Sequence, residues 1–280
     1  MTGDGIYISA EELAEVLDII NQYYGYDFHD YATASIKRRV LRCMEMSNIR
    51  NAYDLKYRLV NDREYFNWFL ESITVNVTEM FRDPEFYKEL RQKIFPKLAT
   101  YPVIKIWHAG CATGEEVYSM AIMLHEEGLL DRTKIYATDV NPLNIDKARK
   151  GIMPLQQMKS YTQNYINAGG KAEFAGYYTA RYNNAIIRKE LKKNILFSQH
   201  NLVTDQAFNE FQLVCCRNVL IYFNKALQNK AVNLFYDSLS PLGYIALGTK
   251  ESLLFTELRD KFDVVSAANK IYKKKKLQNK

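Results

Sequence analysis

The chain has 280 residues, of which 48% are apolar and 25% charged, so it can form one large domain or two modest ones around a buried core. It holds no run approaching the roughly 20 apolar residues of a membrane span and no signal peptide, so we expect a cytoplasmic protein without direct membrane insertion. The net charge of +6 favours an acidic partner. Composition alone does not decide whether that partner is nucleic acid, an anionic membrane or an acidic protein helix.

The first part of the chain predicts helices only. Ser9 and Glu12 form a capping box, in which each side chain binds the backbone N–H of the other residue. Apolar residues then repeat at helical spacing in three segments: Leu13, Val16, Leu17 and Ile20; Ile36, Val40 and Met44; Phe66, Phe69, Leu70 and Ile73. We predict an all-helical N-terminal domain over residues 1–78.

From residue 79 the pattern predicts an α/β domain that extends to residue 280. A helix starts at Asp83-Pro84, with the aspartate as its cap. Short apolar strands then alternate with helices, as in a parallel, doubly wound sheet. The expected strands are Ile104–Ala109, Lys134–Thr138, Ile195–Ser198, Gln212–Cys216 and Tyr244–Gly248, followed by an antiparallel pair, Phe262–Ser266 and Lys270–Lys273. Residues 153–193 interrupt the alternation and predict a small inserted antiparallel subdomain.

The four cysteines are expected to be buried thiols. Cys43, Cys111, Cys215 and Cys216 contain no C-x-x-C pair, and the last two lie inside an apolar run. This spacing favours neither a zinc site nor a disulfide framework, so we expect no metal.

A glycine-containing segment, His108-Ala-Gly-Cys-Ala-Thr-Gly-Glu-Glu116, joins the first expected strand to a helix. Glycines at such a turn let the backbone approach a ligand closely. Two carboxylates would repel a pyrophosphate but suit a ligand with a cationic amine or sulfonium, such as S-adenosylmethionine. Alternatively, Glu115 and Glu116 are first-turn acids favoured by the helix dipole.

An acidic residue, Asp139, closes the next strand, where it could accept hydrogen bonds from ribose hydroxyls. Alternatively, it caps the helix that begins near Asn141-Pro142, and the two roles are compatible.

Two further segments carry polar residues at places where α/β folds bind ligands. Asn76-Val-Thr-Glu-Met-Phe-Arg82 joins the helical and α/β parts, although Thr78 and Arg82 could be ordinary linker residues. Arg217, Asn218 and Tyr222 follow a strand at the carboxyl edge of the sheet, as Asn201 does after another strand. A core position is the simpler alternative for Tyr222.

Together these segments resemble the chemotaxis receptor methyltransferases, the CheR family of protein-glutamate O-methyltransferases. The matching strings are NVTEMFRD, AGCATGEE, ATDVNP, FSQHNL, CCRNVLIYF and GTKESL, in family order and spacing. The resemblance implies a class I S-adenosylmethionine methyltransferase domain behind a substrate-recognition domain. It also implies that the insertion corresponds to the family's β-subdomain. Among the departures, Leu242 stands where glycine is frequent.

The resemblance also implies site residues. The residues expected to contact the cofactor are Asn76, Thr78, Arg82, Glu116, Asp139, Asn201, Leu202, Arg217 and Asn218. Arg82 and Tyr222 are expected nearest the transferred methyl group, as the catalytic pair. The basic residues of the second helix, Lys37, Arg38, Arg39 and Arg42, are expected to face the acidic methylation helices of a receptor.

These implications predict an enzyme that converts S-adenosylmethionine to S-adenosylhomocysteine while esterifying receptor glutamates, and that acts as a monomer. A nucleic-acid methyltransferase is disfavoured because the chain contains no Asn/Asp-Pro-Pro-aromatic string, and we expect no nucleic-acid partner. A non-catalytic adaptor that binds cofactor or receptor as a signal is the alternative from another class.

Overall fold

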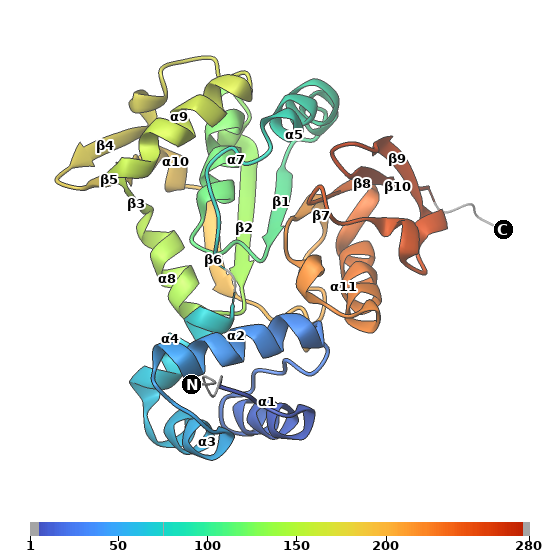
Figure 1. Cartoon of the computed structure of the whole chain (residues 1–280). Coiled ribbons are helices and arrows are strands. Elements are labelled where there is room, and N and C mark those ends of the chain that lie inside the picture. The colour runs from blue at the N-terminus through green and yellow to red at the C-terminus, as the bar shows by residue number, and fades with distance from the viewer. Residues whose placement is uncertain (1–5, 75, 277–280) are drawn as a thin grey trace. The chain divides into compact units, whose positions relative to one another are not determined.

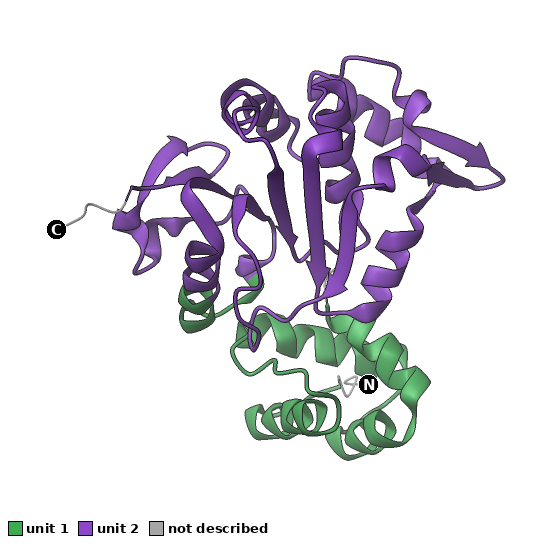
Figure 2. Ribbon diagram, turned by 180° about the vertical axis from the view of Figure 1, so that it is seen from behind, with its two compact units in different colours: residues 1–75, 222–230 green, residues 76–221, 231–280 purple. Residues whose placement is uncertain are grey.

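The computed structural model describes residues 6–74 and 76–276. The chain divides into two compact units, one of residues 1–75 with 222–230 and the other of residues 76–221 with 231–280 (Figure 2). The sequence suggested a single border between residues 78 and 79 and did not assign residues 222–230 to the helical part.

The first unit contains α1 (Ala10–Tyr24), α2 (Thr33–Met46), α3 (Ala52–Asn61) and α4 (Arg63–Ile73) (Figure 1). The capping box is complete, because Ser9 Oγ accepts from the Glu12 N–H at 3.1 Å and Glu12 Oε2 accepts from the Ser9 N–H at 2.8 Å. The three apolar faces predicted from the sequence are buried. Helix α3 was not predicted from the sequence; it buries only Ala52, Leu55 and Leu59 and leaves Tyr53 and Tyr57 exposed.

Residues 222–230 pack on this helical unit through their first residues. The Ala32 N–H donates to the Tyr222 carbonyl at 2.8 Å, and Asn224 Nδ2 donates to Asp30 Oδ1 at 3.0 Å. Tyr31 forms a β-bridge with Phe223, and their rings are 5.1 Å apart. Tyr222 therefore contacts the helical unit, although it directly follows residues of the α/β unit in the chain.

The α/β unit is built on a seven-stranded sheet with the order β6-β2-β1-β7-β8-β10-β9 (Figure 1). Its strands are β1 (Ile104–Ala109), β2 (Thr133–Asp139), β6 (Ile195–Gln199), β7 (Phe211–Cys216), β8 (Leu239–Leu247), β9 (Phe262–Ser266) and β10 (Ile271–Lys274). The first five strands of this order pair in parallel, and β10 pairs antiparallel with both β8 and β9. The predicted parallel sheet and terminal antiparallel pair are thus confirmed.

The helices of this unit lie between the strands in the chain. They are α5 (Pro84–Glu89), α6 (Phe95–Leu98), α7 (Glu115–Glu126), α8 (Pro142–Lys150), α9 (Met158–Asn167), α10 (Lys189–Lys192) and α11 (Lys225–Ser238), whose first turns belong to the helical unit. A π-helical turn, Leu90–Ile94, joins α5 to α6. The proline at position 96 has no N–H for a regular helical bond, so a wider turn is tolerated here.

One local prediction was wrong. Asp83 occupies the N-cap position of α5, but its side chain makes no capping hydrogen bond, and its backbone has φ 58°. The carboxylate instead pairs with Arg217, at 2.7 Å. A buried guanidinium is a stronger partner than an exposed backbone N–H, so the ion pair determines where this side chain points.

The segment after α8 forms a second sheet of β3 (Ile152–Pro154), β4 (Tyr178–Arg181) and β5 (Asn184–Ile187), in the antiparallel order β3-β5-β4. Its buried residues, including Met153 and Ile187, belong to the same apolar core as the main sheet. Across residues 6–74 and 76–276, none of the helices combines the length and the apolar character that a membrane crossing requires. In the same part of the chain all four cysteines are buried and free.

Candidate functional site

The turn between β1 and α7 is held against the end of β2. The N–H groups of Gly110 and Cys111 both donate to the Thr138 carbonyl at 2.8 Å. Gly110 and Gly114 have φ of 76° and 97°, a region that side chains rarely adopt. A Cβ on Gly110 would lie 2.6 Å from Val219 Cγ2, so the turn also packs closely on the segment after β7.

Asp139, at the end of β2, organises this turn. Its Oδ2 accepts from the Ala112 N–H at 2.9 Å, and its Oδ1 accepts from the Asn141 N–H at 2.9 Å and from Asn144 Nδ2 at 3.1 Å. Burial raises the pKa of Asp139, although these hydrogen bonds act against it. Asn141, not Asp139, caps α8, because its side chain accepts from the Leu143 N–H. About four lone-pair positions on a carboxylate meet three protein donors here, which leaves room for a ligand hydroxyl.

A buried ion-pair network lies at the ends of the next two strands, β1 and β7. The Arg217 side chain, which is 1% exposed, donates to Glu116 Oε2 at 2.9 Å and to Asp83 Oδ2 at 2.7 Å. Its guanidinium also lies 4.0 Å from the centre of the Phe86 ring. Although burial acts to raise it, the hydrogen bond from His108 and the charge of Arg217 lower the pKa of Glu116 to about 2.

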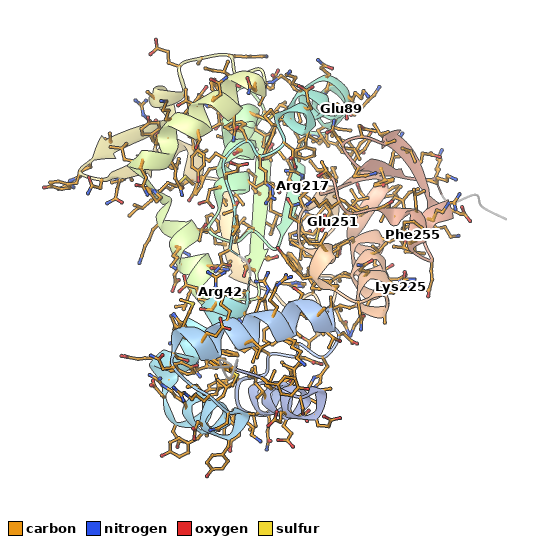
Figure 3. All side chains as sticks on the ribbon, in the orientation of Figure 1. Arg42, Glu89, Arg217, Lys225, Glu251 and Phe255 are labelled. Carbon is orange, nitrogen blue, oxygen red and sulfur yellow. The ribbon has the colours of Figure 1, made fainter. Side chains whose placement is uncertain are left out.

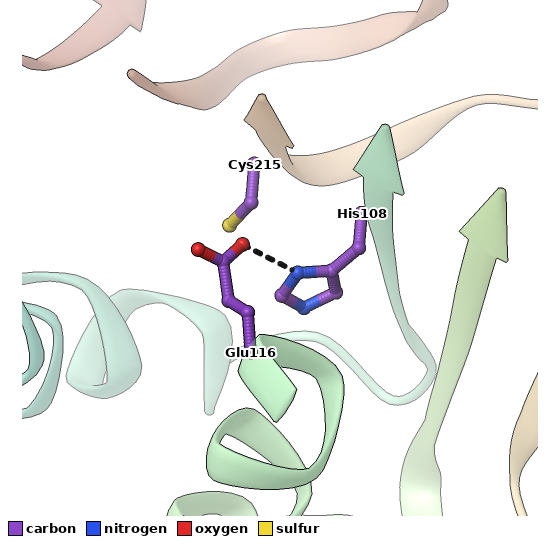
Figure 4. A group of neighbouring side chains, drawn as sticks. All are labelled: His108, Glu116 and Cys215. Atoms are coloured by element: carbon purple, nitrogen blue, oxygen red, sulfur yellow. Dashed lines mark hydrogen bonds and ion pairs between the residues drawn. The ribbon is translucent and has the colours of Figure 1, made fainter. Parts of the chain in front are cut away.

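The ionised Glu116 also fixes the tautomer of His108. Because the carboxylate can only accept, His108 Nδ1, 2.9 Å away, carries the hydrogen. Figure 4 shows this pair beside Cys215, and their ligand atoms lie within 4.8 Å of one another, a distance that would suit a metal ion. A cation there would meet the Arg217 guanidinium, and burial raises the pKa of the Cys215 thiol well above its usual value. The cluster is therefore better suited to an ion pair than to a metal.

The segment after Val75 is tied to both parts of this edge. Asn144 Nδ2 donates to Asn76 Oδ1 at 2.7 Å, which links the segment to Asp139. The half-buried Arg82 donates from Nη1 to the Val77 carbonyl at 3.3 Å, and its own carbonyl accepts from Arg217 Nη2 at 3.4 Å. Thr78 lies between them, half-buried.

The remaining expected cofactor residues follow β6 and β7. Asn201 forms a turn in which its Oδ1 accepts from the Val203 N–H at 2.9 Å, and Leu202 is buried. Asn218 follows Arg217 directly and has φ 62°, which is unusual for a residue other than glycine. Of the nine expected residues, the structure joins Asn76 to Asp139 through Asn144, and separately joins Arg217 to Glu116 and to the Arg82 carbonyl.

The basic residues of α2 do not form one uniform surface. Arg38 and Arg42 are exposed, and Lys37 lies over the Tyr7 ring at 4.9 Å. Arg39 is half-buried, donates to the Ile73 carbonyl at 3.3 Å and lies 5.0 Å from the centre of the Tyr222 ring. Arg39 is therefore occupied within its own unit, whereas Arg38 and Arg42 are exposed.

Comparison with known proteins agrees with this geometry. Residues 76–271 match the family described as "CheR methyltransferase, SAM binding domain", and residues 11–74 match "CheR methyltransferase, all-alpha domain". The chain belongs to the CheR methyltransferase family. A Pseudomonas putida protein that carries the name methyltransferase Cher3 is 48% identical over 263 residues, which are 94% of this chain and 96% of that protein.

Other CheR relatives carry the name chemotaxis protein methyltransferase. The Vibrio cholerae protein of that name numbered 1 is 33% identical and covers 70% of this chain and 71% of its own length. The Listeria innocua protein is 29% identical, with 84% and 88% covered. The resemblance seen in the sequence is thereby confirmed, as are the fold class and the cofactor, S-adenosylmethionine.

The residues at the carboxyl edge fit this cofactor. Asp139 retains an acceptor position for a ribose hydroxyl, and Glu116 supplies negative charge suited to a cationic amine. The first turn of α7 adds a second buried acid, Glu115, which accepts from Thr113 Oγ1 at 2.7 Å. This set would disfavour a polyphosphate, as the sequence suggested.

Sequence reasoning missed three residues of this edge. His108, the penultimate residue of β1, orients Glu116, Asp83 pairs with Arg217, and the buried Glu251 accepts hydrogen bonds from the segment after β7. For His108 the available signal was a polar residue within a buried strand, where it needs a partner.

Proposed function

We propose that this chain methylates glutamate side chains on acidic signalling helices of a chemoreceptor-like protein. The observation that carries the proposal is the position of Asp139, Glu116 and Arg217. They lie on or directly after β2, α7 and β7, around the carboxyl ends of three adjacent strands. Open α/β sheets bind their ligands at that edge, and the chain belongs to a methyltransferase family.

The proposed reaction requires little proton transfer by protein side chains. A glutamate carboxylate in water has a pKa of about 4.3, so it is already ionised near neutral pH and needs no general base. When bound, S-adenosylmethionine would supply the methyl group: the glutamate oxygen would form a bond to the methyl carbon as that carbon's bond to sulfur breaks, and S-adenosylhomocysteine would leave. The protein must align the reacting atoms and exclude water, and positioning can contribute on the order of 7–11 kcal/mol.

Within this proposal, Asp139 holds the ribose and Glu116 faces the amino group. Arg217 keeps Glu116 ionised, because it is buried and charged beside that carboxylate. Arg82 and Tyr222 act as the residues nearest the transferred methyl group. The exposed Arg38 and Arg42 attract the acidic helix that carries the target glutamate.

The proposal is tested by transfer of a tritiated methyl group to purified receptor signalling helices. A methyl ester of glutamate releases volatile methanol in alkali, whereas methylated amines do not, so alkali-labile label is the expected result. Label that appears only on added nucleic acid, or alkali-stable label on protein, would contradict the proposal. Cofactor binding without any transfer would support a non-catalytic adaptor instead.

The roles of Arg82 and Tyr222 are tested by Arg82→Ala and Tyr222→Phe in the same assay, with circular dichroism to verify the fold. We expect both variants to lose at least about tenfold in turnover, the scale of one lost transition-state hydrogen bond. Turnover close to that of the wild type in both folded variants would show that the assignment is wrong.

A further inference from the structure

Glu251 is a buried carboxylate with an unusual set of partners. It lies four residues after the end of β8 (Figure 3). Its exposed fraction is 5%. Its Oε2 accepts from the backbone N–H groups of Gly248, at 2.5 Å, and Asn218, at 3.0 Å. Its Oε1 accepts from those of Val219, at 2.8 Å, and Ile221, at 3.3 Å. Each oxygen thus binds two main-chain donors.

Three of these four donors belong to one short segment, residues 218–221. The segment begins directly after Arg217 at the end of β7, and Tyr222 follows it in the chain. It opens with Asn218 in the left-handed region, at φ 62°, which asparagine adopts more readily than other non-glycine residues. The hydrogen bonds to Glu251 therefore hold the backbone between residues proposed to bind the cofactor and to act in transfer.

Two glycines pack against the same segment and leave little space around it. A Cβ on Gly248 would lie 2.8 Å from both the Asn218 nitrogen and Glu251 Oε2. A Cβ on Gly110, in the glycine turn, would lie 2.6 Å from Val219 Cγ2. The segment is thus fixed by the carboxylate on one side and by close packing on two others.

The partners of Glu251 are dipoles rather than charges. Within the described residues no ion pair to Glu251 is present, in contrast to Glu116 and Glu126. A buried carboxylate without a cation is costly unless its lone pairs are occupied, and here four N–H groups occupy them. Several adjacent N–H groups of this segment need acceptors, and a carboxylate with two oxygens can supply them together.

We propose that Glu251 is a positioning residue for methyl transfer, which acts through the backbone of residues 218–221 to fix Asn218 and Tyr222. The inference rests on the proposed function. A glutamine side chain has one acceptor oxygen, and its NH₂ group cannot accept from the other pair of N–H donors. Glu251→Gln therefore removes two of the four hydrogen bonds with almost no change in volume.

The test measures Glu251→Gln against the wild type with receptor helix as substrate. Calorimetric titration with S-adenosylhomocysteine counts the folded, binding-competent molecules, and turnover at saturating S-adenosylmethionine is divided by that number. We expect kcat per binding site to fall at least about tenfold, while the KM for receptor helix changes less than about threefold. Wild-type kcat per binding site would overturn the inference and leave Glu251 a purely structural residue.

A matched control is Glu126→Gln. Glu126 is also buried, with a side chain that is 3% exposed, and accepts from Arg91 at 2.6 Å and from the Tyr177 hydroxyl at 2.9 Å. It lies at the end of α7, and the partners named here for it, Arg91 and Tyr177, lie outside residues 218–221. Glu126→Gln should lower the melting temperature but keep wild-type kcat per binding site. An equal loss of kcat in both variants would show that any buried charge change lowers turnover, and would contradict a specific role.

A second variant keeps the inference testable if Glu251→Gln does not fold. Gly248→Ala leaves the carboxylate intact but places a methyl group between Glu251 and Asn218, so it should lower kcat per binding site in the same direction. Unchanged kcat in folded Gly248→Ala would overturn the inference. The proposed function itself fails only if the wild type transfers no methyl group, so the two failures are distinguishable.

Discussion

The guanidinium of Arg39 lies 5.0 Å from the centre of the Tyr222 ring, inside the helical unit. The same side chain donates to the Ile73 carbonyl at 3.3 Å, and the Tyr222 carbonyl accepts from the Ala32 N–H at 2.8 Å. Both the ring and the backbone of Tyr222 are therefore held by residues of the N-terminal part of the chain. Arg39, which was expected from the sequence to face the receptor, thus contacts a residue proposed to act in methyl transfer.

Arg39→Ala should consequently lower turnover rather than receptor affinity. A cation–π contact of about 0.5–2 kcal/mol corresponds to a loss of roughly twofold to thirtyfold if it is fully used to orient Tyr222. Steady-state kinetics with receptor helix should show a lower kcat and a nearly unchanged KM. The control is Arg38→Ala, a neighbouring exposed arginine, which should raise KM only. A raised KM with unchanged kcat in Arg39→Ala would return Arg39 to the receptor-binding surface.

Charge reversal at Arg38 and Arg42 should weaken recognition of an acidic helix. Both side chains are exposed, so they act through electrostatics that salt screens. We expect Arg38→Glu with Arg42→Glu to raise the receptor KM by about tenfold at low salt, and by less at about 0.5 M salt. Affinity for S-adenosylhomocysteine, measured by calorimetry, should not change. Equal loss of receptor recognition and of S-adenosylhomocysteine affinity would indicate misfolding. An unchanged KM would show that the receptor binds to another surface.

Glu116 should make stability dependent on acid pH. Its pKa is lowered to about 2, so its ion pairs stabilise the fold above the unfolded-state pKa near 4.5. This contribution, on the order of 3 kcal/mol, is lost as pH falls from 4.5 through about 2. Urea unfolding at several pH values should therefore show a shallower decrease over this window for Glu116→Gln than for the wild type. Identical slopes would show that Glu116 is not held ionised by Arg217 and His108.

Leu242 offers a site where stability can be gained. It occupies β8 at φ 64°, in a region that favours glycine, and the CheR resemblance places a frequent glycine at this position. Leu242→Gly should raise the free energy of unfolding by about 1 kcal/mol, because it removes a left-handed backbone penalty of roughly 1–2 kcal/mol and the side chain is 39% exposed. Leu242→Ala, which retains the penalty, is the matched control. Destabilisation by Leu242→Gly in urea unfolding would show that packing of the side chain outweighs the strain.

Periodicity predicted most of the fold because each strand is short, apolar and followed by a distinct turn or helix. The limits of β1 and β9 agree with the structure to the residue. Helix α3 was missed because only three of its ten residues are buried, so its apolar pattern is weak. The union of residues 222–230 with the helical unit depends on contacts of Tyr31 and Asp30 far away in the chain, which no local pattern contains.

The site could be predicted to the extent that its residues stand in recognisable strings. Glu116, Asp139 and Arg217 follow from their strings and strand ends, and the structure connects each to the glycine turn or to its neighbours. The partners of these residues could not be predicted, because they come from distant parts of the chain. Arg217 meets Asp83 across more than 130 residues, and Glu251 meets Asn218 across more than 30.

The proposed methyl transfer requires that the carboxyl ends of β1, β2 and β7 form the S-adenosylmethionine site, to which Asp139 contributes from the end of β2. Calorimetric titration with S-adenosylhomocysteine tests this arrangement, using wild type, Asp139→Ala and Asp146→Ala, an aspartate of α8 whose side chain is 60% exposed. We expect saturable binding by the wild type and Asp146→Ala, and at least about tenfold weaker binding by Asp139→Ala, the effect of losing one charged hydrogen bond. Wild-type affinity in folded Asp139→Ala would contradict the arrangement.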